Sequence, residues 1–205
     1  MTRTLPLRVP LAALLGLFVA TTAGAQDDPV EDHAMHDDME IAGDMSDLPM
    51  RANDEARPSP NAVVGQTVGT TDVYVQYGRP SVRGRELFGG LVPYGEVWRT
   101  GANEATTFTA SGDVTVEGQR LPAGTYALFT VPGEDAWTVI FNRTAEQWGS
   151  FRYDEAQDAL RVTATPTEIA PTEQFTIAFT DVSEGAAVMH LHWGTVGVPL
   201  RIEAE

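Results

Sequence analysis

The sequence predicts an all-β domain folded as an antiparallel β-sandwich, with a flattened β-barrel as the alternative. Two observations predict this fold class: short runs in which apolar and polar residues alternate, and turns rich in Gly, Pro and Asp between those runs. Consecutive strands without helical crossovers favour antiparallel sheets. A third observation is the segment 78–104, which Gly and Pro interrupt repeatedly and which predicts a long ordered loop carrying short helical turns.

Six runs carry the strand signal. In each of them every second residue is apolar, so the apolar side chains share one face of a sheet. The turns Glu117–Gly118 and Glu184–Gly185 supply reversals of the kind that hairpins need. The predicted strands span residues 72–77, 125–131, 137–142, 175–180, 187–193 and 196–202. Short helical pieces are predicted only at 85–91, 95–100 and 144–149.

Residues 1–25 have the pattern of a secretory signal peptide. Arg3 and Arg8 precede an apolar run at 11–20, and the small residues 23–25 form an A-x-A cleavage site. The apolar run is shorter than the roughly 20 residues that a membrane-spanning helix needs. We therefore expect an exported protein, periplasmic or extracellular, with no membrane span in the mature chain.

Residues 26–56 form an acidic segment with 11 acids and one arginine, and they contain no aromatic residue. Charge repulsion and the lack of core residues predict a disordered tail before a single β domain at 57–205. Imidazole and thioether groups suit copper, so the tail is also a candidate copper site. The alternative is a solvated tether whose methionines are incidental. The candidate copper ligands are His33, Met35, His36 and Met39.

Composition excludes several classes of function. The 205-residue chain has no Cys, which rules out disulfides, Cys-ligated zinc, iron–sulfur clusters and thiol nucleophiles. Its formal net charge of −16, with 13 Arg, no Lys and 29 acids, argues against binding to nucleic acid. No other cofactor is expected from the sequence.

An arginine-rich island lies within the segment 78–104. Residues 79–99 contain four Arg and two Glu, whereas residues 57–205 as a whole contain 10 Arg and 18 acids. Guanidinium groups bind carboxylates and phosphates bidentately, and aromatic rings add a stacking face. The predicted ligand-binding residues are Arg83, Arg85, Arg99, Trp98, Tyr94, Arg79, Asn103 and Glu104. Alternatively, these arginines tie the loop down by bonding carbonyls and neighbouring acids.

Several motifs in and after this segment resemble one family of exported bacterial proteins, the domain-of-unknown-function family 2911. The motifs are Arg79-Pro-Ser-x-x-Gly-Arg85, Phe88-Gly89, Leu91-Val-Pro-Tyr-Gly95, Trp98-Arg-Thr-Gly-Ala-Asn-Glu104, Leu121-Pro-Ala-Gly-Thr-Tyr126, Trp137-Thr-Val-Ile-Phe-Asn142, Gln147-Trp-Gly149 and Leu191-x-Trp193. The resemblance covers about residues 57–205. It implies no established activity, so it specifies the family much better than the function.

We expect a binding module that holds a small or extended anionic or sugar ligand through the loop 78–104. One alternative is a hydrolase that uses Glu96 or Glu104 as its acid or base, although no G-x-S-x-G turn is present. The other is an envelope protein that binds a protein partner. His190 and His192 project to the same face of a strand, so they are either half of a metal site or part of a polar face.

Overall fold

Two antiparallel sheets make up residues 56–205, which are the residues that the computed structural model describes. The first sheet has the strand order β1-β2-β3-β6-β7-β8, and the second has the order β5-β4-β10-β9. The strands are β1 (Asn61–Val68), β2 (Thr71–Gly78), β3 (Thr106–Ala110), β4 (Val114–Val116), β5 (Gln119–Leu121), β6 (Gly124–Val131), β7 (Trp137–Asn142), β8 (Asp158–Ala164), β9 (Thr167–Thr180) and β10 (Ala186–Ala204). The predicted β-sandwich is confirmed.

Alternating side chains of both sheets form the main core. The apolar faces predicted for β2, β7 and β10 lie in or against one buried cluster, because each strand turns every second side chain toward the opposing sheet. Strands β6 and β7 are also covered on their other face. A second cluster there contains Ala105, Ala127, Phe129 and Ile140, with Val97 and Tyr153 packed against it.

Two of the predicted strands are one element in the structure. Residues 187–193 and 196–202 belong to the single long strand β10, which pairs with β9 through register shifts around Gly194. A bulge bends a strand without ending it, and Gly194 at φ 60° provides the bend. The predicted turn at Glu117–Gly118 joins β4 to β5, with φ of 50° and 72°. Positive φ at both central positions is what a tight hairpin requires.

The predicted short helical pieces do not form. Residues 85–91, 95–100 and 144–149 consist of turns, bends and isolated bridges, and the described residues contain only one 3₁₀ turn, η1 (Glu155–Gln157). Gly89 and Gly95 have φ of 87° and 76°, a conformation that no helix propagates. Within residues 56–205 no helix is long and apolar enough to cross a membrane.

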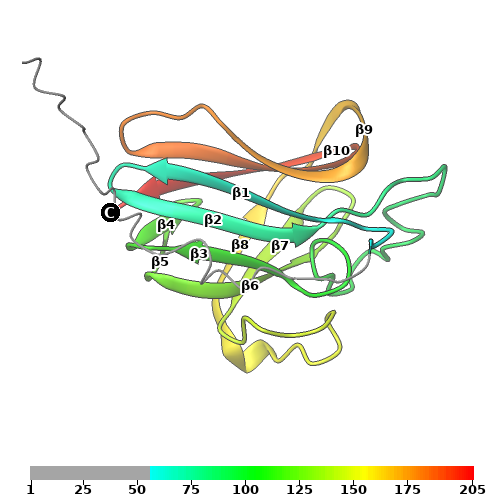
Figure 1. Cartoon of the computed structure of the whole chain (residues 1–205), viewed down its shortest axis with the longest axis horizontal. Helices are drawn as coiled ribbons and strands as arrows, with labels where there is room; N and C mark the ends of the chain where they lie inside the picture. Colours follow the sequence, from blue (N-terminus) through cyan, green and yellow to red (C-terminus); the bar gives the residue numbers. More distant parts are fainter. Residues whose placement is uncertain (1–55) are drawn as a thin grey trace, which may run out of the picture. The chain divides into compact units, whose positions relative to one another are not determined.

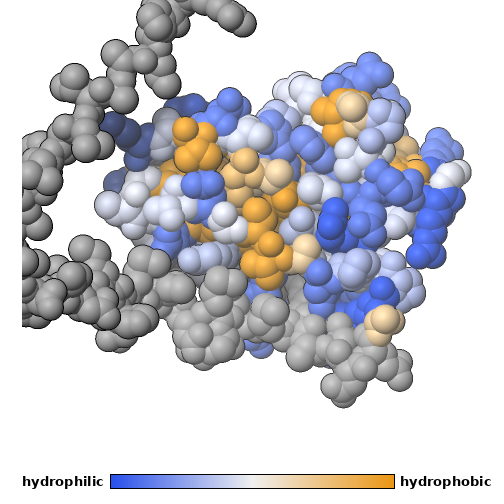
Figure 2. Space-filling view, turned by 45° about the horizontal axis from the view of Figure 1, so that its top comes forward, coloured by the Kyte–Doolittle hydropathy of each residue, from blue (hydrophilic) through white to orange (hydrophobic). Residues whose placement is uncertain are grey.

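The loop between β2 and β3 lies at one end of the two sheets. Figure 1 shows it at the right, opposite the end that carries the C-terminus. The exposed tip of this loop is mostly hydrophilic in the space-filling view (Figure 2). The candidate site lies at the base of the loop, where its buried part meets β9 and β10.

Candidate functional site

Backbone hydrogen bonds hold the loop to both sheets. Trp98 exchanges two bonds with Thr130 of β6, with N···O distances of 2.7 and 2.9 Å. The amide of Val82 donates to the carbonyl of Glu173 on β9 at 2.8 Å. These anchors fix the loop over the open end of the sandwich, so its side chains occupy defined positions.

An aromatic cluster forms the floor of the site. Trp98 is only 8% exposed and stacks on Trp193 of β10, with ring centroids 5.6 Å apart and planes inclined by 13°. Phe88, Trp137 and Phe175 meet Trp98 edge to face. Trp98 is therefore mainly a core residue, and it does not offer the exposed stacking face that the sequence suggested.

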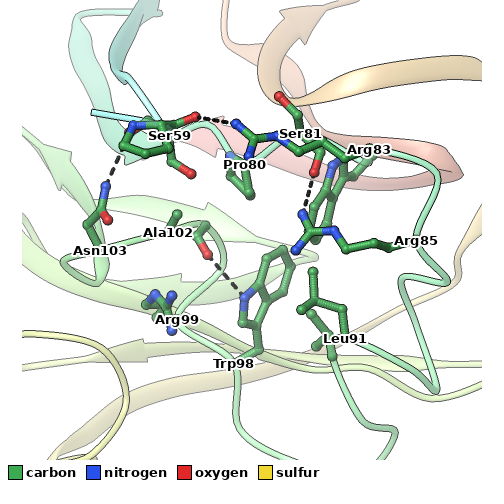
Figure 3. A pocket seen from close by; sticks show the side chains of 14 residues that line it. Ser59, Pro80, Ser81, Arg83, Arg85, Leu91, Trp98, Arg99, Ala102 and Asn103 are labelled. Carbon is green, nitrogen blue, oxygen red and sulfur yellow. Dashed lines mark hydrogen bonds between the residues drawn. The ribbon is translucent and has the colours of Figure 1, made fainter. Parts of the chain in front are cut away.

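A cleft of about 310 Å³ opens above this floor. Arg83, Arg85, Arg99 and Asn103 line it, as the sequence predicts, and so does Trp98. In Figure 3, Arg85 and Arg99 lie on either side of the Trp98 ring. Three guanidinium groups and no carboxylate are among its lining residues. The other residues of its wall are Pro58, Ser59, Pro80, Ser81, Leu91, Val92, Gly101, Ala102 and Trp193.

Arg99 is the least compensated charge of the cleft. Its side chain is half-buried, its Nε atom is buried without a hydrogen-bond partner, and no carboxylate of the described residues pairs with it. Burial lowers the pKa of the Arg99 guanidinium, although an arginine stays charged at any ordinary pH. A desolvated cation without a counter-charge is unfavourable, and an anion in the cleft would compensate it.

Arg83 and Arg85 are oriented by carbonyl groups. Arg85 donates from Nε to the Val82 oxygen at 3.0 Å and from Nη2 to the Ser81 oxygen at 2.6 Å. Arg83 donates from Nη2 to the Pro58 oxygen at 3.5 Å. The two carbonyl oxygens hold the Arg85 guanidinium in place without neutralising it, so its positive charge remains available to a ligand. The Arg83 backbone amide donates to the Glu173 carboxylate at 3.0 Å.

Two predicted site residues lie outside the cleft and have structural partners. Arg79 donates to the Phe175 carbonyl at 3.1 Å and to the Thr176 hydroxyl at 2.9 Å, and so attaches the loop to β9. Glu104 accepts two bonds from Arg57, both at 2.8 Å, in a partly buried ion pair. The contacts of Arg79 and Glu104 therefore agree with the alternative interpretation, in which the charged residues of the loop attach it to the rest of the domain.

The backbone on either side of Arg99 is tightly constrained. Thr100 is fully buried with φ 52°, an unfavourable conformation for a β-branched residue. Its hydroxyl bonds to that of Thr130 at 3.1 Å, and its carbonyl accepts from the Thr106 hydroxyl at 2.6 Å. At Gly78 a Cβ atom would overlap the carbonyl of Ala102, so only glycine fits there. These contacts fix the position of the wall that carries Arg99.

Tyr94, also a predicted site residue, lines a second cleft of about 340 Å³. It is 42% exposed, and its ring packs closely over Gly89, where a Cβ atom would lie 3.0 Å from Cε2. Arg85 and Trp193 line both clefts, so the two cavities adjoin.

His190 and His192 lie on the same face of β10, with ring centroids 5.1 Å apart. His190 Nε2 is 2.7 Å from the Thr180 hydroxyl. Within residues 56–205 no group of three His, Cys, Asp or Glu side chains is placed to hold a metal ion. The pair therefore has no further ligand among the described residues.

The histidine pair predicts a pH dependence of stability. Burial, and secondarily the charge of His190, lowers the pKa of His192 below its ordinary 6.5. As the pH falls below 6.5, the unfolded chain therefore binds more protons than the folded chain. The contribution of neutral His192 to the free energy of unfolding is fully present above pH 6.5 and is lost as the pH falls through the lowered pKa. Urea unfolding of His192→Gln should show a weaker fall in stability over that range than the parent. Equal slopes in the two proteins would contradict the assignment.

Sequence reasoning missed Trp193 and the serines as residues of the cleft. Trp193 ends the predicted strand 187–193 and is 2% exposed, yet it borders both clefts and its buried Nε1 has no hydrogen-bond partner. Ser59 and Ser81 line the first cleft. The predicted strand at 187–193 and the Leu191-x-Trp193 motif both point to this part of β10, but neither links it to the loop 78–104.

Three predictions fall outside the described residues. They are the signal peptide at 1–25, the disordered tail at 26–56 apart from its last residue, and the copper ligands His33, Met35, His36 and Met39. Export and copper binding by the tail therefore stay predictions.

Comparison with known proteins identifies the family. No curated protein and no solved structure matches the chain significantly. A family model described as "Protein of unknown function (DUF2911)" matches residues 59–202, which includes both sheets and the loop that forms the two clefts. The match covers more than half of the chain and confirms the resemblance seen in its motifs. The chain is a member of the DUF2911 family.

Proposed function

We propose that this protein is an exported binding module that holds an anionic ligand in the cleft lined by Arg83, Arg85 and Arg99. The observation that carries the proposal is the half-buried Arg99 side chain, which has no counter-charge among the described residues. Desolvated charges in stable proteins are normally paired. A carboxylate, a phosphate or an acidic sugar would supply the missing partner.

The distribution of acids supports binding rather than hydrolysis. Neither cleft is lined by Asp or Glu, and Glu104 is paired with Arg57. The hydrolase alternative, which uses a glutamate as its acid or base, needs that carboxyl group within hydrogen-bond reach of the reacting atoms. Because Glu96 and Glu104 are outside both clefts, the hydrolase alternative has no site residue in this region.

Anion binding at this cleft can be tested with the full-length protein by thermal shift. Phosphate, sulfate, acetate and glucuronate should each be titrated against the parent and against Arg99→Met, which keeps most of the aliphatic stem. A ligand at ten times its dissociation constant stabilises the folded state by about 1.4 kcal/mol, which raises the melting temperature by roughly 3–6 °C for a domain of this size.

The matched control is Arg201→Gln, because Arg201 is an exposed arginine of β10 whose side chain pairs with Glu203 and lines neither cleft. The parent and Arg201→Gln should show the same shift, and Arg99→Met should lose it while remaining folded. A shift that persists in Arg99→Met, or the lack of any shift in the parent with all four anions, contradicts the proposal.

A further inference from the structure

The first cleft is larger than an anionic group needs. Its volume of about 310 Å³ corresponds to roughly ten water molecules at about 30 Å³ each. A carboxylate or phosphate beside Arg99 displaces only a few of these waters. The ligand is therefore expected to extend beyond its charged group.

The adjoining cleft offers a different chemistry. Its wall is mostly apolar, and its only charged lining residue is Arg85. Thr195 contributes the one aliphatic hydroxyl, so few groups are available to bond the hydroxyls of a sugar. The apolar and aromatic side chains of this wall are Val82, Leu87, Phe88, Tyr94, Trp193 and Val196.

Arg85 connects the two clefts. Its bonds to the Val82 and Ser81 carbonyls hold its guanidinium in a fixed orientation, and it is a lining residue of both cavities. Trp193 is the second shared residue. Each cavity, at about 310 and 340 Å³, lies at the lower end of the 300–1,000 Å³ range of ligand pockets.

We infer that the ligand is an amphipathic anion: its oxyanion group pairs with Arg99 in the first cleft, and an apolar or aromatic body passes Arg85 and packs on Tyr94 in the second. This inference rests on the proposed function, because it assigns the charged group to the same cleft. It adds that the body of the ligand is apolar and that Tyr94 contributes to its affinity.

Three probes separate the two parts of the site: inorganic phosphate, phenyl phosphate and glucose 6-phosphate, each titrated calorimetrically into the full-length protein. Burial of one ring against apolar side chains makes phenyl phosphate bind roughly tenfold or more tightly than phosphate. Glucose 6-phosphate, whose body is polar, should gain much less. The phosphate titration alone reports on the proposed function.

The variants are Tyr94→Ala and Phe151→Ala, both at exposed aromatic residues, of which only Tyr94 lines a cleft. Tyr94→Ala should remove most of the advantage of phenyl phosphate and leave phosphate binding unchanged, whereas Phe151→Ala should change neither. If phosphate binds but phenyl phosphate binds no more tightly, or if glucose 6-phosphate gains as much affinity as phenyl phosphate, the inference of an apolar body is contradicted. The proposed anion site is unaffected by either result. If neither phosphate nor phenyl phosphate binds, both the proposed anion site and the inference of an apolar body are contradicted.

Discussion

Replacement of Trp98 with alanine is expected to lower the free energy of unfolding by about 3–5 kcal/mol, the range found for large aromatic residues in cores. Trp98 stacks on Trp193 and meets Phe88, Trp137 and Phe175 edge to face, so its removal leaves a cavity among four rings. The indole Nε1 also donates to the Gly101 carbonyl at 3.1 Å, and this bond is lost as well. Chemical denaturation of the variant measures the effect.

Trp148→Ala is the matched control, because the Trp148 side chain is 58% exposed. This change should cost less than about 1 kcal/mol, as exposed side chains away from special contacts generally do. Trp98→Phe should fall between the two, since it keeps a ring and loses the bond to Gly101. Equal losses in Trp98→Ala and Trp148→Ala would mean that the aromatic cluster does not hold the loop on the sheets.

The fold could be predicted where the alternation is long and regular. Strands β2, β6 and β7 coincide with predicted runs to within one residue at either end. Strand β1 (Asn61–Val68) was missed because Val63 and Gln66 break the alternation of Ala62, Val64 and Val68, and its side chains are mostly half-buried at a sheet edge. Strands β4 and β5 have three residues each, which is too short for any periodic pattern.

The types of residue in the site could be predicted from the sequence, but the direction in which each side chain points could not. Arg79 and Arg99 look alike in the sequence, but one is bonded to β9 and the other faces the cleft without a partner. The difference arises from long-range pairing: β9 lies nearly 100 positions further along the chain, and its Phe175 carbonyl and Thr176 hydroxyl accept bonds from the side chain of Arg79 but not from that of Arg99. Local sequence holds no information on such contacts. The same reason explains why Trp98, predicted as a residue that stacks on a ligand, is buried against Trp193.

The second large effect is expected at Asp158, which sequence reasoning did not single out. Its nearly buried carboxylate accepts bonds from Asn142 at 2.7 Å, from the Tyr153 hydroxyl at 2.7 Å and from Arg161 at 2.8 Å. Asp158→Ala should cost about 2–4 kcal/mol, because it leaves a buried amide, a phenol and a guanidinium without this acceptor. Asp135→Ala, at an exposed turn between β6 and β7, should stay within about 0.5 kcal/mol of the parent.

Titration of Tyr153 provides a second, independent readout of the same contact. Burial, and then the hydrogen bond to Asp158, raises the pKa of Tyr153 from 10.0 to about 12. The neutral phenol is therefore favoured in the folded state, and the stability that it adds is present below about pH 10 and lost as the pH rises toward 12. In Asp158→Ala the tyrosine pKa should fall but stay above 10.0, because burial is the larger cause. The ultraviolet difference between each protein and its Tyr153→Phe counterpart isolates this residue. An unchanged pKa in Asp158→Ala would show that the carboxylate does not hold the phenol.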